Sequence, residues 1–272
     1  MSYHIHFPSF PLSRFVDHLF LLRSEPMAAH REQIMPDGRV TLMFNLGEPQ
    51  RQYNSASSNS YRRFDKGWIT GQRTRPIVVG QTKTVDFAGV VFQPWGAYPF
   101  LRMPLSELKE TVAEVDALWG PFVDEVREQV ALCETPAAAF SILESMLHAR
   151  LDRDRIQIGD VEFAAGCIMQ SAFDVGMKTI VSRMGISHKQ LTRRFRDVVG
   201  ITPKKLSRVE RFRQVLHAIP ANGVVSWVTL AQQFGFCDQS HLNREFRELG
   251  EITPTRYLEL TGDYPAYVSL GD

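Results

Sequence analysis

One pattern occurs twice between residues 185 and 254, and it limits the fold of this chain more than any other part of the sequence. The first copy reads Gly-Ile-Ser-His-Lys-Gln-Leu-Thr-Arg-Arg-Phe-Arg, followed by Ile-Thr-Pro, and the second reads Gly-Phe-Cys-Asp-Gln-Ser-His-Leu-Asn-Arg-Glu-Phe-Arg, again with Ile-Thr-Pro. A repeat of this kind predicts one structural unit made twice. The matched positions are Leu191, Arg193, Phe195, Arg196, Thr202 and Pro203 in the first copy and Leu242, Arg244, Phe246, Arg247, Thr253 and Pro254 in the second.

Each copy predicts a helix, a tight turn and a second helix. Apolar residues precede Gly235 at helical spacing, and a glycine suits the left-handed end of a helix. Asp238 is then a suitable N-cap, and Leu242 with Phe246 forms an apolar stripe. This order is typical of a helix-turn-helix unit, whose second helix enters the DNA major groove. The first copy has the same order, with Ile180, Val181 and Met184, then Gly185, Ser187 as the cap, and Leu191 with Phe195 as the stripe.

Polar side chains opposite the apolar stripes are of the types that read bases. Arg and Lys donate to guanine, whereas Asn and Gln pair with adenine through two bonds. We expect base readout from His188, Lys189, Thr192 and Arg193 in the first unit and from Gln239, Ser240, Asn243 and Arg244 in the second. Basic residues further round the helices or downstream suit phosphates, which set register and affinity: Arg194, Arg196, Lys204, Lys205, Arg247 and Arg256.

The carboxy-terminal segment resembles the DNA-binding domain of AraC/XylS-type transcription regulators. The most specific match runs from Trp227 through Leu258, and the first copy departs at Val181, where the family usually places alanine. The resemblance implies two helix-turn-helix units joined by a long helix, here from Pro203 to Ile219.

Charge is divided unevenly along the chain. The net charge is near zero, but residues 176–262 carry 14 Lys and Arg against 7 Asp and Glu, whereas residues 1–175 carry 17 against 21. A basic tail behind an acidic front indicates that double-stranded DNA binds the tail alone. RNA polymerase and a small-molecule effector are candidate further partners, and the chain would act as a monomer or a homodimer.

Cysteine usage and the amino terminus indicate a cytoplasmic protein. Cys133, Cys167 and Cys237 are isolated from one another, which argues for a reducing compartment and predicts three small core residues. The first residues lack the basic and apolar regions of a signal peptide, and no apolar run approaches the length of a membrane span.

Residues from about Phe7 to Leu101 predict an antiparallel sandwich or barrel. The run from Arg39 to Leu46, between turn residues, is a strand candidate, and further candidates are 68–70, 76–80 and 82–92. The Ser- and Asn-rich stretch from Gln50 to Tyr61 predicts a long exposed loop. The segment also resembles the cupin-like domains found ahead of AraC-type units, in Pro-Asp-Gly followed by Val-Thr-Leu-Met-Phe-Asn-Leu-Gly and in Gly-Val-Val-Phe-Gln-Pro.

A cupin-like domain raises the alternative of an enzyme. Metal-dependent cupins need several His and a carboxylate on strands, but no His lies between Arg31 and Leu147. His4 and His6 are more simply explained as solvated residues near a terminus. We therefore expect no catalytic residues, no metal site and no cofactor.

The front domain can instead bind an effector. Aromatic surface with a few polar groups is the usual form of a ligand site, although the same aromatics can simply fill a core. The candidate effector-binding residues are Phe44, Trp68, Arg73, Phe92 and Trp95.

From Leu105 to about Phe173 the spacing predicts helices. Pro121 and Pro136 each begin a helix, and Arg150 to Arg155 suggests a solvated hinge. The sequence thus predicts a multidomain α and β protein, with a β-rich sensor or dimerisation domain at 1–104, a helical connector at 105–155 and an all-α DNA-binding domain at 156–272. We expect a sequence-specific transcription regulator. The alternatives are a cupin-like enzyme or sensor tethered to DNA, and a constitutive DNA binder without effector.

Overall fold

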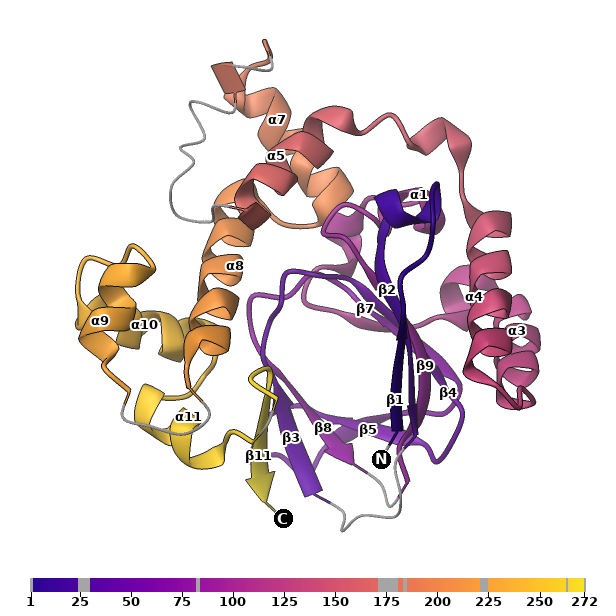
Figure 1. Cartoon of the computed structure of the whole chain (residues 1–272), viewed down its shortest axis with the longest axis horizontal. Helices are drawn as coiled ribbons and strands as arrows, with labels where there is room; N and C mark the ends of the chain where they lie inside the picture. The colour runs from indigo at the N-terminus through magenta and orange to yellow at the C-terminus, as the bar shows by residue number, and fades with distance from the viewer. Residues whose placement is uncertain are drawn as a thin grey trace.

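A computed structural model describes residues 2–23, 30–81, 84–170, 181–182, 185–220, 225–262 and 264–271. Two antiparallel sheets form the β-rich part of the molecule, which is called the front domain below (Figure 1). The first sheet has the order β1 (Ser2–His6), β2 (Val16–Arg23), β9 (Asp86–Phe92), β4 (Thr41–Asn45), β7 (Gly67–Thr70) and β10 (Val112–Glu114). The second has the order β11 (Tyr267–Gly271), β3 (His30–Ile34), β8 (Ile77–Gln81), β5 (Gln50–Tyr53) and β6 (Tyr61–Phe64).

The remaining elements are helical. The short ones are η1 (Leu12–Arg14), α1 (Tyr98–Leu101), η2 (Leu105–Leu108), α2 (Asp116–Trp119) and η3 (Arg153–Arg155). The longer ones are α3 (Phe122–Ala131), α4 (Pro136–Arg150), α5 (Gly159–Gln170), α7 (His188–Val199), α8 (Pro203–Ala218), α9 (Trp227–Gln233), α10 (Gln239–Leu249) and α11 (Pro254–Leu260). A β-rich front and a helical tail confirm the predicted fold class.

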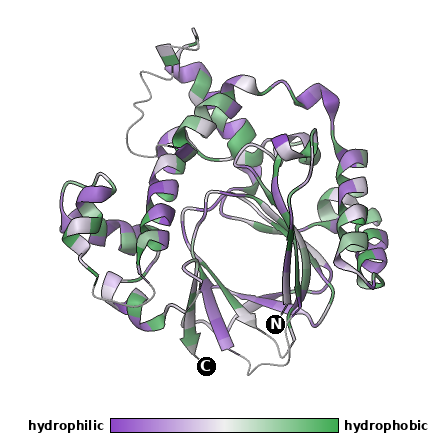
Figure 2. Ribbon diagram, in the orientation of Figure 1, coloured by the Kyte–Doolittle hydropathy of each residue, from purple (hydrophilic) through white to green (hydrophobic). Residues whose placement is uncertain are grey.

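The first sheet has two apolar faces, because apolar side chains point alternately to one face and the other along its strands. Leu42 and Phe44 of β4 face α3 and α4, which pack on the outside of the sheet (Figure 1). Met43 faces the opposite way, toward the second sheet, and packs against the cluster that contains Phe20 and Trp68. The second sheet is more hydrophilic, and Figure 2 shows β3 and β5 largely in purple. Strand β4 lies within the strand predicted at 39–46, and α4 buries the apolar face that was predicted for it, so both predictions are confirmed.

Two apolar clusters divide the helical tail between them. The first cluster combines the outer face of the first sheet with α3, α4 and α5, and it includes Leu191 and Phe195 of α7. The second cluster surrounds α9 and α10 and includes Met35, from the connection after β3, and Val268 of β11. Helix α8 contributes to both clusters, through Leu206 to the first and Phe212 to the second.

Some sequence-based predictions are wrong. The exposed loop predicted at 50–61 is confined to residues 54–60, because Gln50–Tyr53 forms strand β5, which pairs with β6 from Gln50↔Phe64 to Tyr53↔Tyr61. Within the predicted helical connector, Val112–Glu114 is a strand that pairs with β7. Cys237 is exposed, so it is not a core residue.

The predicted solvated hinge at 150–155 is exposed only in part. Arg153 and Asp154 are exposed, but the flanking residues are half-buried. Arg150 Nη2 donates to the carbonyl of Trp119 at 2.8 Å, and its guanidinium lies over the Trp119 ring. Arg155 lies over the Tyr98 ring, 4.2 Å from the centroid, so both ends of the segment pack on aromatic rings.

The division at residues 104 and 155 stays a prediction. Two strands outside the first segment, β10 and β11, nevertheless belong to the front sheets. Among the described residues, no helix is long and apolar enough to cross a membrane.

Candidate nucleic-acid interface

The first recognition helix is α7. Gly185 has a φ of 63°, a conformation that glycine adopts at little cost, and it lies just before the start of α7. Ser187 then caps α7: its Oγ accepts from the Gln190 backbone N–H at 3.2 Å, and the Gln190 side chain accepts from the Ser187 N–H at 2.9 Å. This reciprocal pair is a capping box. Ile180 and Met184 of the predicted preceding helix lie outside the described residues.

The second recognition helix, α10, begins in the same way. Gly235 has a φ of 68°, and Asp238 Oδ1 accepts from the His241 backbone N–H at 2.7 Å. Phe246 is fully buried on the inner face of α10. Its ring lies 5.1 Å from that of Phe212 on α8 and 5.5 Å from that of Trp227 on α9, both nearly edge-on. These contacts fix α10 against its two neighbouring helices.

Most of the predicted readout side chains reach solvent. The exposed ones are His188, Lys189 and Arg193 on α7 and Gln239, Ser240 and Arg244 on α10. Thr192 and Asn243 occupy matched positions in the two helices and are half-buried. Thr192 Oγ1 and Asn243 Oδ1 are buried and have no hydrogen-bond partner among the described residues. The structure therefore leaves six of the eight predicted readout side chains exposed on their helices and buries one polar atom of each of the other two.

The predicted phosphate-binding residues fall into two groups. Arg196, Lys204 and Arg247 are exposed, and so is Arg256, which pairs with Glu259 at 2.7 Å. The other two contact protein.

Arg194 and Lys205 also contact protein groups. Arg194 is exposed, and its Nε lies 2.8 Å from Asp160 Oδ2 of α5. Lys205 is half-buried, and burial, followed by the charge of Lys109, lowers its pKa. Their predicted phosphate contacts stay predictions.

An ion-pair network that sequence reasoning missed holds α10 to α8. Arg208 Nε lies 3.1 Å from Glu245 Oε1, and Arg208 Nη2 also pairs with Glu248. The Glu245 side chain is 7% exposed. Burial opposes the charge of Arg208, but hydrogen bonds to Glu245 and Glu248 raise its pKa overall. The only sequence signal was a carboxylate beside Phe246 on the predicted inner face of α10.

The five candidate effector residues do not form one site. Phe44 and Phe92 belong to the first cluster, outside the first sheet, whereas Trp68 lies on its other face. Trp95 Nε1 donates to the carbonyl of Arg14 at 3.0 Å. Arg73 is buried and donates to the carbonyl of Ile34 at 3.3 Å, and burial lowers its pKa. Most of these aromatics fill cores.

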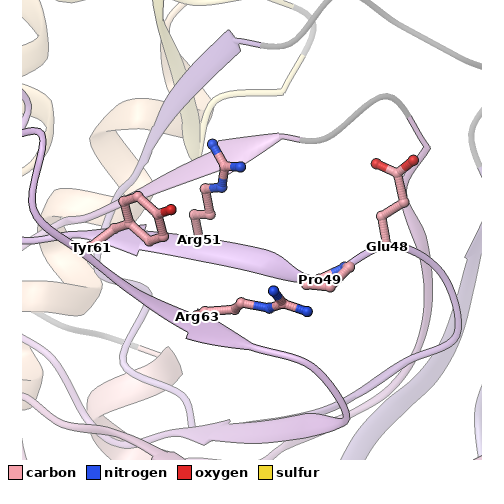
Figure 3. A pocket seen from close by; sticks show the side chains of 5 residues that line it. All are labelled: Glu48, Pro49, Arg51, Tyr61 and Arg63. Atoms are coloured by element: carbon pink, nitrogen blue, oxygen red, sulfur yellow. The ribbon is translucent and has the colours of Figure 1, made fainter.

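A pocket of about 280 Å³ lies on the β5–β6 hairpin (Figure 3). Arg51 stacks over the Tyr61 ring there, 4.9 Å from the centroid, and Arg63 pairs with Asp65 at 2.6 Å. The pocket contains none of the five candidate effector residues. Its lining residues are Glu48, Pro49, Arg51, Tyr61 and Arg63.

The two amino-terminal histidines lie on β1. His6 Nε2 lies 3.0 Å from Glu144 Oε1, and its ring stacks on Phe140 at 5.2 Å, so it is not simply solvated; His4 is exposed. Within the described ranges, no three His, Cys, Asp or Glu side chains gather as a metal site.

Solved structures of ToxT from Vibrio cholerae are similar to this chain over most of its length. One is 10% identical with a TM-score of 0.48, covering 96% of this chain and 100% of that chain. Another, ToxT from Vibrio cholerae O395 bound to (E)-4-(8-methylnaphthalen-1-yl)but-3-enoic acid, is 10% identical with a TM-score of 0.47, covering 95% and 99%. No curated protein matches the chain significantly.

Two family models match separate parts of the chain. Residues 4–114 match a domain of unknown function, DUF6597. Residues 180–259 match a helix-turn-helix domain, and they span both recognition helices and α8. The carboxy-terminal part of the chain is therefore an AraC-type helix-turn-helix domain, which supports DNA-binding transcription regulation as the function of the chain.

Proposed function

We propose that α7 and α10 enter successive major grooves, about 34 Å apart along the duplex, and read two short elements of one asymmetric site. The observation that carries this proposal is the matched pair of capped helices, each with a buried inner stripe and exposed polar side chains at its amino-terminal end. The six exposed readout residues contact bases. Arg196, Lys204, Arg247 and Arg256 contact phosphates.

Selection of bound sequences from a random duplex pool tests this function directly. Two short motifs about one helical turn apart should be enriched by the full-length protein at near-physiological salt. Enrichment of one motif would restrict base reading to one helix, and no enrichment would contradict the proposal.

Substitutions then separate base contacts from phosphate contacts. Arg193→Ala and Arg244→Ala should each cost roughly 1–3 kcal/mol of binding and relax specificity at one position. Lys204→Ala should weaken all sequences equally and flatten the salt dependence, whereas Lys205→Ala should do so less, because Lys205 is half-buried and Lys204 is exposed. Equal loss on every sequence for Arg193→Ala and Lys204→Ala would contradict the assignment of roles.

We further infer that the front domain is a sensor or dimerisation module and that the chain is not an enzyme. No histidine lies between Arg31 and Leu147, so the strands from β4 to β10 lack the imidazole ligands that a cupin-type metal site needs, which supports this reading. A shift in melting temperature with a small molecule would support an effector, and stoichiometric metal in the purified protein would favour the enzyme alternative.

A further inference from the structure

The last strand of the chain is built into the sheet of the front domain. After α11, residues 261–266 lead directly into β11, which pairs antiparallel with β3 from Tyr267↔Ile34 to Gly271↔Arg31. Figure 1 shows β11 beside β3, at the edge of the second sheet, below α11. Six residues span about 20 Å at most. The second helix-turn-helix unit is therefore tethered closely to this sheet edge.

One face of the β3–β11 pair is part of the core of the second unit. Val268 and Gln33 lie opposite each other in register. Val268 is fully buried in the second cluster, and Gln33 Nε2 donates to the carbonyl of Gly250, directly after α10 ends. Met35, which follows β3, is 1% exposed in the same cluster and donates its N–H to the carbonyl of Ala266 at 2.8 Å.

The segment before β11 is also engaged, whereas Tyr267 and Ser269 on the other face of the strand are exposed. Tyr257 of α11 donates its hydroxyl to the carbonyl of Pro265 at 2.8 Å, which holds the segment before β11 against the second unit. The strand is thus fixed on the sheet side and on the helix side.

The first unit is anchored to the front domain separately. Leu105 and Leu108 of η2 share the first cluster with Leu191 and Phe195 of α7. A Cβ at Gly200, just after α7, would lie 2.9 Å from the Leu105 carbonyl oxygen, so the two segments are in close contact. Because each unit has its own attachment, the front domain as well as α8 determines where the two recognition helices lie.

The docked strand leaves the reading surface open. Gln239, Ser240 and Arg244 remain exposed while β11 is paired. Docking therefore positions α10 without covering it.

We propose that β11 is a strap that sets the spacing between the two DNA elements which the chain reads. This inference rests on the proposed two-element function. With β11 paired, α10 keeps one distance and one direction relative to α7. With β11 released, the second unit keeps α8 and the contacts of Gln33 and Met35 but loses Val268 from its core, so it is held less firmly, reaches elements over a range of spacings and contributes less at the best one.

Val268→Asn tests the strap, because it places a polar side chain in the buried position. Ser269→Asn is the matched control, since it introduces the same side chain at the neighbouring, exposed position. Affinity is measured on duplexes in which the distance between the two elements changes one base pair at a time, and on duplexes with the second element scrambled. We expect wild type and Ser269→Asn to show one sharp optimum. Val268→Asn should lose about tenfold at that optimum, show a flatter profile, and keep wild-type affinity for the scrambled duplex.

A cross-strand disulfide separates release from misfolding. Glu32 and Ser269 lie directly opposite each other, a position in which Cβ atoms are about 4.5–5.5 Å apart. Glu32→Cys with Ser269→Cys is added to Val268→Asn, in a chain whose native cysteines are replaced by serine. Oxidation should restore the sharp optimum, and reduction should flatten it again.

Three outcomes are distinguishable. A flat profile that oxidation sharpens supports the strap. A sharp profile in Val268→Asn, unchanged by oxidation or reduction, overturns it. If wild type itself is indifferent to the second element, the two-element function fails, and the strap proposal falls with it.

Discussion

The two helix-turn-helix units share their local chemistry but differ in what supports them. Both recognition helices start at a side-chain cap after a left-handed glycine and bury a phenylalanine. The first unit, however, completes its core with the outer face of the first sheet and its helices, whereas the second forms a small core of its own with β3 and β11 attached. A local pattern therefore defines a recognition helix, but tertiary partners determine how firmly it is held.

Removing the buried phenylalanine of each unit should have the largest effect. Phe195→Ala and Phe246→Ala should each lower the free energy of unfolding by about 3–5 kcal/mol, because both side chains are fully buried. Phe195→Ala should also reduce hydrogen-exchange protection in β2 and β9, since its cluster includes their outer face. Phe246→Ala should leave those strands protected. Loss of protection there in both variants would contradict separate cores.

The ion pairs of the two units should differ in strength. Arg208→Met leaves the nearly buried Glu245 without its hydrogen bonds to Arg208, with only His241 nearby at 3.8 Å, so it should cost about 1–3 kcal/mol of unfolding free energy. Arg194→Met is the matched change in the first unit. Its pair with Asp160 is more exposed, so the cost should stay within about 1 kcal/mol. Chemical denaturation measures both, and equal costs would show that burial does not distinguish the pairs.

Sequence patterns identified what is local in these units. The caps at Ser187 and Asp238 and the helix Pro203–Ala218 could be predicted because their signals lie within a few residues of one another. β11 could not, since its partner β3 is more than two hundred residues away. The ion pair of Arg208 and Glu245 could not be predicted either, because it depends on how two helices pack against each other.

The effector candidates illustrate the same limit in the front domain. Aromatic residues were evident in the sequence, but their allocation to opposite faces of the first sheet depends on strand register. The strand at 112–114 was hidden because apolar residues spaced by three or four also suit short turns between sheet strands.

Removing the N-cap of each recognition helix should have a smaller effect on stability. Ser187→Ala and Asp238→Ala should each cost about 1 kcal/mol of unfolding free energy, because each removes the acceptor for a backbone N–H at a helix start. Asp238→Asn keeps an acceptor and should cost less than Asp238→Ala. Circular dichroism during denaturation measures these differences. An unaffected Ser187→Ala would show that the capping box adds nothing to the stability of α7.

The smallest expected effect is a pH dependence of the unfolding free energy that comes from His217, in the second half of α8. His217 is largely exposed, but partial burial, followed by the charge of Arg213, lowers its pKa from 6.5; Arg39 acts in the same direction and Glu210 opposes it. Because the folded state then binds protons more weakly than the unfolded state, stability is complete above about pH 6.5 and declines as the pH falls through the lower, folded pKa. His217→Gln should therefore flatten the slope of stability against pH just below 6.5, measured by denaturation at a series of pH values. His188→Gln, which removes an exposed imidazole from the first unit, is the control, and an unchanged slope in His217→Gln would assign the pH dependence elsewhere.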